Sequence, residues 1–143
     1  MELHQPTDCV AFYGHGDRDN LLAQPDPSGV TLVDAANASL LVGKLIYVVA
    51  CDSGASLGPW IVSQGAEAYL GYDDLLGIVW GGPEVWFRDG ANSALMYLIA
   101  PQIGGAATCD AAVQEARRVY TAGIEFYIRG AGQGHPNYAL AAA

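Results

Sequence analysis

One segment restricts the fold of this chain more than any other, and it is the apolar run LIYVVA at residues 45–50. The run is unbroken by polar residues and is rich in β-branched side chains, which favour extended backbone. A strand without polar alternation has no face that suits water, so both of its faces must be covered. Strands of this kind occupy the interior of parallel sheets. The run therefore predicts an α/β fold with a mainly parallel sheet.

The remaining segments predict how that sheet is completed. Short apolar runs predict further strands at 10–13 and 68–72, and a short strand or extended arm at 30–33. Apolar spacings of three and four, together with end signals, predict helices at 34–44, 59–63, 84–100 and 110–127. We expect Asp34 to be the N-cap of the first helix, with Leu40 and Leu41 facing inward. Residues 14–29, rich in Gly, Asp and Pro, predict a loop, and the whole chain (1–143) is expected to form one domain.

Composition narrows the possible partners. The 143 residues are 52% hydrophobic and 15% charged, which is enough apolar material for one core. The formal net charge of −9 repels phosphate backbones, and no basic stripe offsets it, so we expect no nucleic-acid partner. The uncharged stretch at 90–109 is interrupted by Asn, Gln, Gly and Pro, which favours a buried helix and a loop over a membrane span.

The first residues and the cysteines predict the cellular compartment of the protein. The first ten residues, MELHQPTDCV, lack the basic and apolar regions of a signal peptide. Three cysteines, an odd number, do not make a disulfide framework. We therefore expect a reduced, cytoplasmic setting.

Two predicted strand ends carry residues with catalytic chemistry. His15 follows the strand at 10–13 between two glycines, and Cys51 follows the strand at 45–50 directly. The carboxyl ends of neighbouring parallel strands share one edge of a sheet, so the two side chains are expected on the same edge. A thiol nucleophile needs a nearby proton carrier, and histidine titrates in the right range. Spacing alone also leaves room for a core cysteine and an ordinary loop histidine.

The residues of the two motifs resemble those of the caspase-like superfamily of cysteine peptidases. The segments YGHGD at 13–17 and VACDSG at 49–54 are similar to the His-Gly and Ala-Cys elements of that superfamily, and the second is closest to legumains and gingipains. The resemblance implies a three-layer αβα sandwich and peptide-bond cleavage through an acyl-enzyme, without a cofactor. It implies Cys51 as nucleophile and His15 as general acid and base, with the backbone N–H groups of Gly16 and Cys51 as the oxyanion hole.

Substrate binding is less specified than catalysis. Members of the superfamily commonly require one particular residue on the acyl side of the cut, and this sequence does not reveal which one. Four residues are candidates for binding a peptide or protein substrate: Asp17, Asp52, Ser53 and Asp73. The acidic members of this set, together with Asp19 and Asp74, could line a pocket for a basic side chain. The alternative for each carboxylate is an ordinary solvated loop residue.

The start of the chain departs from the superfamily pattern. Members carry further strands and helices before the histidine strand, whereas about nine residues precede it here. We therefore expect a trimmed sheet, or missing elements supplied by another chain or by a longer protein. An uncovered sheet edge favours association, so a homo-oligomer or a partner chain is expected. The same departure supports an alternative function, a catalytically inactive scaffold or sensing domain.

A serine hydrolase is a second alternative. Residues 54–58 (GASLG) fit the G-x-S-x-G pattern with Ser56 as nucleophile, although three residues separate this pattern from the preceding strand. Its acid and base would come from Asp73, Asp74 or Asp110 and from His135. We expect no metal site, because the remaining candidate ligands lack a ligand spacing: His4, Cys9, Cys109 and His135.

Overall fold

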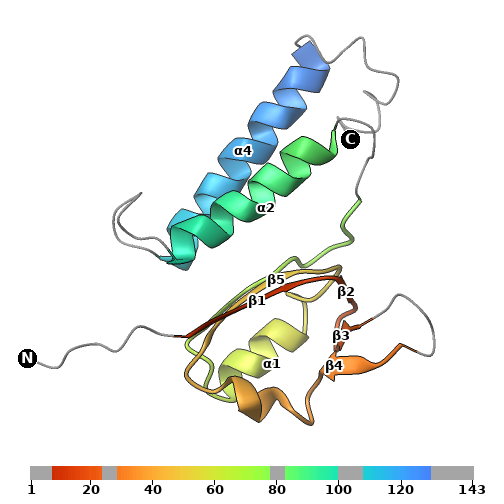
Figure 1. The fold of residues 1–143 in the computed structure, drawn as a ribbon, viewed down its shortest axis with the longest axis vertical. Helices are drawn as coiled ribbons and strands as arrows, with labels where there is room; N and C mark the ends of the chain where they lie inside the picture. The colour runs from red at the N-terminus through yellow and green to blue at the C-terminus, as the bar shows by residue number, and fades with distance from the viewer. Residues whose placement is uncertain (1–7, 24–28, 78–82, 100–107, 130–143) are drawn as a thin grey trace, which may run out of the picture. The chain divides into compact units, whose positions relative to one another are not determined.

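A computed structural model describes residues 8–23, 29–77, 83–99 and 108–129. The chain divides into two compact units, Met1–Leu76 and Gly77–Ala143, and each is described by itself. The first unit contains the described strands and one α-helix, and the second contains two long α-helices (Figure 1). The α/β class predicted from the sequence is confirmed. That the chain forms a single domain stays a prediction.

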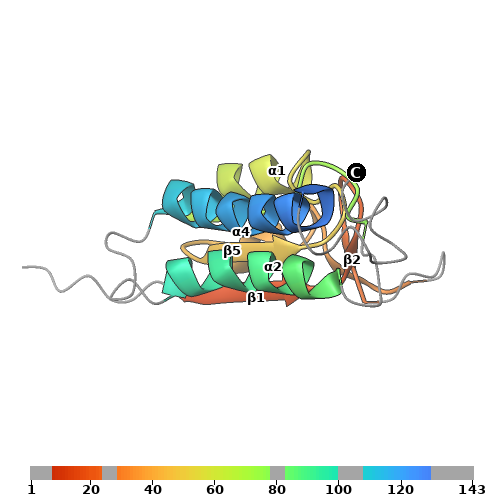
Figure 2. The ribbon, with the colours of Figure 1, turned by 90° about the horizontal axis from the view of Figure 1, so that it is seen from above.

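A three-stranded parallel sheet forms the centre of the first unit. Its strands are β1 (Cys9–Tyr13), β5 (Leu45–Val49) and β6 (Ala68–Leu70), in the order β1-β5-β6. Both pairings are parallel, and β1 lies alongside β5 over its whole length, as Figure 2 shows from above. Residues 46–49 of β5 are between 0% and 6% exposed. The predicted central strand, buried on both faces, is confirmed.

One face of this sheet packs against helix α1 (Leu57–Ser63). Side chains of a strand alternate between its faces, so Ile46 and Val48 point to the same side and meet Leu57 and Ile61 of the helix. The eight buried residues of this core are Leu21, Ala38, Ile46, Val48, Ala50, Leu57, Ile61 and Ala66. Helix α1 ends before Gly65, whose φ of 105° lies in the left-handed region that terminates helices.

The segment expected to be a loop at 14–29 contains two short strands, and that expectation was wrong. β2 (His15–Gly16) pairs antiparallel with β3 (Leu21–Leu22), which pairs with β4 (Thr31–Val33) to form a small second sheet. Strands of two residues are too short to show a period of alternation, so the sequence pattern could not reveal them. Leu21, only 2% exposed, attaches this sheet to the core.

The helix expected at 34–44 is only a single 3-10 turn, η1 (Ala38–Leu41). Asp34 is not its N-cap, because the Asp34 carboxylate accepts the Ala36 N–H at 2.8 Å and closes a local turn instead. Such side-chain bonds to the nearby backbone compete with a regular helix. Leu40, expected to face inward, is 74% exposed, whereas Leu41 packs against the core as predicted.

The second unit is a pair of helices, α2 (Glu84–Ile99) and α4 (Cys109–Arg129), that pack along one another. Gly90 of α2 lies directly beneath the Tyr120 ring, and Gly123 of α4 beneath Trp86. A Cβ on Gly123 would lie 2.8 Å from the Cβ of Trp86, so glycine at this position permits the close approach of the two helices. Neither of these helices, nor any other in the described ranges, is long and apolar enough to cross a membrane.

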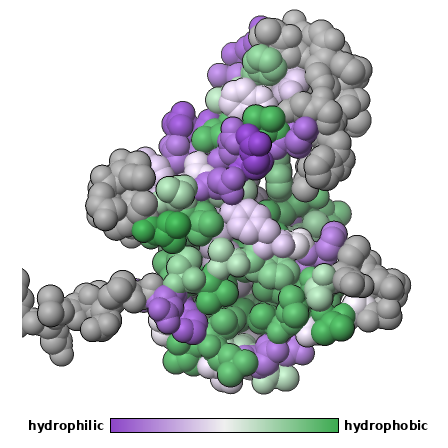
Figure 3. All heavy atoms as spheres, in the orientation of Figure 1, coloured by the Kyte–Doolittle hydropathy of each residue, from purple (hydrophilic) through white to green (hydrophobic). Residues whose placement is uncertain are grey.

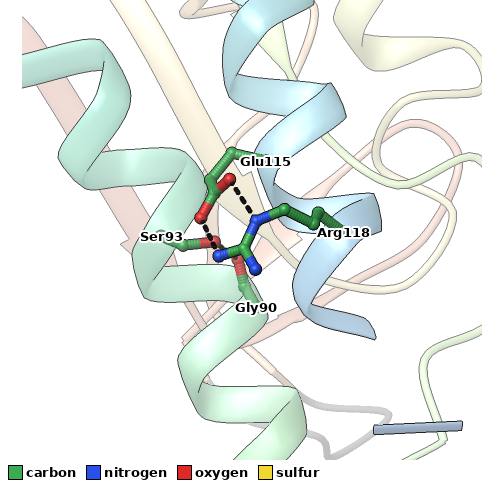
Figure 4. A network of polar contacts seen from close by, with 4 residues as sticks. All are labelled: Gly90, Ser93, Glu115 and Arg118. Atoms are coloured by element: carbon green, nitrogen blue, oxygen red, sulfur yellow. Dashed lines mark hydrogen bonds and ion pairs between the residues drawn. The ribbon is translucent and has the colours of Figure 1, made fainter. Parts of the chain in front are cut away.

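The polar contacts drawn in Figure 4 each join residues of the same helix. Arg118 donates to Glu115 on α4 through Nε at 2.8 Å and through a terminal nitrogen at 2.6 Å. The guanidinium lowers the pKa of the Glu115 carboxyl, and the carboxylate raises the pKa of Arg118. On α2, the Ser93 hydroxyl donates to the Gly90 carbonyl at 2.8 Å. Because the Arg118 side chain is 67% exposed, the contribution of this ion pair to stability is small.

The first unit also carries apolar side chains at its surface, and Figure 3 shows them over much of its visible face. Leu40, Val42, Trp60 and Val62 are between 43% and 74% exposed. An apolar surface of this kind is what the expected association would cover. The association itself stays a prediction.

Replacement of Ile61 by alanine is expected to destabilise the first unit. The side chain is 0% exposed and fills the space between α1 and β5, so its loss should lower the free energy of unfolding by about 2–5 kcal/mol. The adjacent Val62 is 43% exposed, and Val62→Ala should change stability by no more than about 0.5 kcal/mol. Urea denaturation followed by circular dichroism measures both. Equal losses would contradict the core assignment.

Tyr69 of β6 carries a buried hydroxyl group. Its ring packs against α1, where a Cβ on Gly58 would lie 2.7 Å from the Tyr69 ring. The hydroxyl is buried and makes no hydrogen bond within the described part of the chain. Burial raises the pKa of Tyr69 to about 12, because the phenolate form loses its hydration.

Tyr69→Phe is expected to stabilise the protein at neutral pH by about 1–2 kcal/mol, because an unsatisfied buried hydroxyl is removed without a change of ring shape. The gain should increase above pH 10 by about 1 kcal/mol per pH unit. In that range the unfolded tyrosine, with the lower pKa, ionises first and stabilises the unfolded state of the unmodified chain. Urea denaturation at pH 7, 10 and 11 tests this, and a gain independent of pH would contradict it.

Candidate functional site

The parallel pairing of β1 with β5 brings the His15 and Cys51 segments together. Tyr13 pairs with Val49, and the Gly14 N–H donates to the Val49 carbonyl at 3.1 Å, one residue beyond β1. The chain then enters β2 at His15 and Gly16. A Cβ on Gly16 would lie 3.2 Å from the Cys51 carbonyl oxygen, so these two backbones are in contact. The shared edge predicted from the sequence is present.

The side chains of the pair have separate surroundings. The Cys51 Sγ atom accepts a hydrogen bond from the Leu76 N–H at 3.3 Å and lies 4.0 Å from the Leu76 carbonyl. His15 is exposed. Neither residue makes a hydrogen bond to the other in the described part of the chain. Catalytic hydrogen bonds are often long in free enzymes and tighten only when substrate is bound.

The segment after β6 supports the turn that carries Cys51. Residues 72–76 run alongside residues 51–54 and bind them at three points. The Asp52 N–H donates to the Asp74 carbonyl at 3.0 Å, and the Gly54 N–H donates to the Tyr72 carbonyl at 2.7 Å. The third point is the bond from Leu76 to the Cys51 sulfur. Sequence reasoning missed this support, because no local pattern in DDLL at 73–76 announces a partner more than 20 residues away.

Backbone strain lies directly after the cysteine. Asp52 has a φ of 52°, the left-handed region that non-glycine residues rarely adopt and that aspartate tolerates better than most. This conformation turns the chain sharply away from β5. Ser53 follows with 0% exposure, and its hydroxyl donates to the Ala50 carbonyl at 3.0 Å. Ser53 therefore supports the turn, and a role in substrate binding would require the turn to open.

The other expected substrate-binding residues are carboxylates in different surroundings. Asp17, which follows β2, accepts the N–H groups of Asp19 and Asn20, each at 2.8 Å, and so closes the β2–β3 turn. Asp52 is partly buried in the Cys51 turn, while Asp73 is exposed on the segment after β6. Asp73 is thus accessible to a substrate, whereas Asp17 has a structural role in the turn.

An oxyanion hole needs N–H groups that are free to donate. Across the described ranges, the Cys51 N–H donates to no protein acceptor. Gly16, the second expected donor, contacts the Cys51 backbone from β2. The arrangement provides a thiol, an available N–H on the same residue and a histidine on the adjoining segment.

Ser56, the nucleophile of the alternative hydrolase, has a partner that sequence reasoning did not identify. Its hydroxyl donates to Asp19 Oδ1 at 2.8 Å. Asp73 and Asp74 lie on the segment after β6, Asp110 belongs to the second unit, and His135 is outside the described residues. The sequence marked Asp19 as one of the acidic residues that could line a pocket, but its hydrogen bond to Ser56, 37 residues away, had no local signal.

The four candidate metal ligands are not brought together either. His4 and His135 fall outside the described residues, and Cys9 and Cys109 belong to different units. Within the described ranges, no group of three or more potential ligands of the His, Cys, Asp or Glu type is present.

Gly16→Val is expected to disturb the contact between the two motif segments. A Cβ at this position would lie 3.0 Å from the Ala50 Cβ and 3.2 Å from the Cys51 and Asn20 carbonyl oxygens, so a branched side chain forces the segments apart. We expect a loss of about 1–3 kcal/mol of stability. Gly77 has no atom within 4 Å of its Cβ position, which makes Gly77→Val the control. Thermal unfolding of both variants should show a lower midpoint for Gly16→Val alone.

No protein-family model, curated protein or solved structure matches this chain. The candidate site therefore stands on its two motifs and on the strand pairing that joins them.

Proposed function

We propose that this chain is a cysteine peptidase of the caspase-like superfamily, with Cys51 as nucleophile and His15 as general acid and base. The observation that supports it most is the parallel β1–β5 pairing, which brings the His15-Gly16 backbone into contact with Cys51 at the carboxyl edge of the sheet. In this proposal the α/β architecture is the caspase-like three-layer form. The substrate is a peptide or protein, and no cofactor takes part.

The proposed reaction uses the groups at this edge in sequence. His15 removes the proton of the Cys51 thiol, and the sulfur attacks the scissile carbonyl carbon to form a tetrahedral intermediate. The Cys51 N–H donates to the oxyanion, with the Gly16 N–H as the second donor. Collapse breaks the C–N bond, His15 gives its proton to the leaving amine, and an acyl-enzyme remains. A water molecule, deprotonated by His15, then hydrolyses the thioester and restores the thiol.

The Leu76 bond gives the thiol a defined direction before substrate binds. Its N–H lies 3.3 Å from the sulfur, and the ties at Asp52 and Gly54 hold the whole turn against residues 72–76. A nucleophile that is already oriented needs less reorganisation to reach the attacking geometry. Cys9 is a poor competitor for electrophiles, because burial raises the pKa of its thiol and lowers its thiolate fraction at neutral pH.

The composition and the exposed apolar side chains support a proposal on the compartment and partners of the protein. The charge of −9 supports the absence of a nucleic-acid partner, and the three free cysteines, Cys9, Cys51 and Cys109, support a reducing, cytoplasmic compartment. The exposed apolar side chains of the first unit support a homo-oligomer or a partner chain that covers them.

Labelling with peptidyl ketone electrophiles tests the proposal. A panel with Asn, Asp, Arg or Lys at the acyl position is incubated with the full chain, and adducts are located by intact mass and peptide mapping. We expect one adduct on Cys51 with one member of the panel. Cys51→Ala should abolish it, and His15→Ala should slow it by about 10²–10⁴-fold, the usual contribution of a general base.

Cys9→Ala is the matched control, because it removes a thiol of the same unit and should leave the rate of labelling unchanged. Labelling spread over the three cysteines, or a His15→Ala variant that reacts at the original rate, would contradict a peptidase. Such a result would favour the second candidate, a catalytically inactive domain, which is supported by the lack of a His15–Cys51 hydrogen bond within the described chain.

A further inference from the structure

The loops that carry His15 and Cys51 meet a second time, farther from the sheet. The Leu57 N–H donates to the Arg18 carbonyl at 2.7 Å, and the Ser56 hydroxyl donates to Asp19 Oδ1 at 2.8 Å. A hollow of about 220 Å³ opens at this second meeting point. Its lining comes from three segments of the first unit: Asp19, Ala35, Ser56, Leu57 and Trp60. The catalytic proposal uses none of these residues.

The volume of the hollow limits what it can hold. Sites for drug-sized ligands usually enclose about 300–1,000 Å³, so this one suits a group the size of a single side chain. Leu57, 2% exposed, and Ala35 give it an apolar wall. Trp60, 45% exposed, contributes a large indole surface that faces solvent.

Asp19 carries a negative charge that no described residue neutralises. Its Oδ1 atom accepts the Ser56 hydroxyl, which holds the carboxylate in one orientation. Its Oδ2 atom accepts no hydrogen bond, and Asp19 forms no ion pair within the described ranges, although Arg18 is its neighbour in sequence. An oriented carboxylate with one free oxygen is a ready acceptor for a cationic donor.

The combination of an exposed indole and a free carboxylate oxygen is specific for a cation with an apolar stem. A cation over an indole face is attracted by the ring quadrupole, and tryptophan is the strongest aromatic partner. Among biological cations, guanidinium is planar and weakly hydrated, so it stacks on a ring while its N–H groups donate to a carboxylate. An ammonium ion satisfies the carboxylate but retains more of its hydration shell.

We propose that the hollow formed by Asp19, Ala35, Ser56, Leu57 and Trp60 is a binding site for a guanidinium group on a short apolar chain. Asp19 Oδ2 accepts its N–H groups, Trp60 stacks on its plane, and Leu57 and Ala35 contact its methylenes. The same chemistry is offered by a free alkylguanidine and by an arginine side chain of a peptide. This inference does not require Cys51 to be catalytic.

Titration of the full-length Cys51→Ala chain with n-propylguanidinium, followed by two-dimensional ¹⁵N NMR, tests the site. We expect a saturable shift of the Trp60 indole N–H and of the Ser56 and Leu57 amides, with a Kd of roughly 1 mM. Neutral n-propylurea has nearly the same shape without the charge, and it should bind at least about 10-fold more weakly. Use of the Cys51→Ala chain separates this result from the outcome of the peptidase test.

Two substitutions measure how much Asp19 and Trp60 contribute to binding, and a third serves as a control. Asp19→Asn retains the acceptor for Ser56 but removes the charge, and it should weaken binding about 10–100-fold. Trp60→Leu retains an apolar side chain but removes the ring, and it should weaken binding about 2–5-fold. Glu67→Gln removes an exposed carboxylate of the same unit and should change the Kd by less than about 2-fold.

A second titration distinguishes the two sources of guanidinium. The peptide acetyl-Gly-Arg-Gly-amide is compared with its citrulline analogue, in which a neutral urea replaces the guanidinium. Binding at least about 10-fold tighter than that of n-propylguanidinium identifies a peptide as the source, and equal binding identifies a free alkylguanidine. Equal binding of propylurea and propylguanidinium, an Asp19→Asn variant that binds normally, or shifts confined to other residues would overturn the proposal.

Discussion

The burial of β5 is the constraint on which the rest of the first unit depends. Residues 46–49 are almost completely removed from water, and each large apolar side chain buried in this way contributes about 1.5–3 kcal/mol. Because both edges of β5 form parallel pairs, its neighbours β1 and β6 run in the same direction and end at the same edge. Parallel pairing thereby gathers the segments after all three strands in one place, where α/β proteins usually bind ligands.

At that edge, hydrogen bonds fix the backbone more firmly than they fix the candidate catalytic side chains. Hydrogen bonds from Asp52 and Gly54 to the segment after β6 hold the Cys51 turn, and the left-handed backbone of Asp52 is the strain that the turn accommodates. Residues held in such conformations often cluster where a protein binds or reacts. His15, in contrast, is placed by a two-residue strand and remains exposed, so its side chain can rotate toward a substrate.

The same two loops build a second feature, the hollow beside Asp19 and Trp60. Contact between Gly16 and Cys51 lies at the strand ends, while the Ser56–Asp19 hydrogen bond lies at the start of α1. The two features are therefore linked by only a few residues on each loop. A guanidinium ligand in the hollow and a thiol reaction at the strand ends are chemically independent, and separate substitutions can test each.

Much of the sheet, but little of the surrounding detail, was determined by the sequence alone. The runs at 45–50, 10–13 and 68–72 predicted β5, β1 and β6, because burial leaves a local apolar pattern that does not depend on distant residues. The shared edge of His15 and Cys51 followed from parallel pairing. Only the tertiary structure decided the contact of Leu76 with the Cys51 sulfur, because that contact depends on where separate loops meet in space. The helix expected after Asp34 is a single 3-10 turn for a local reason, because the Asp34 carboxylate accepts the Ala36 N–H and competes with a regular helix.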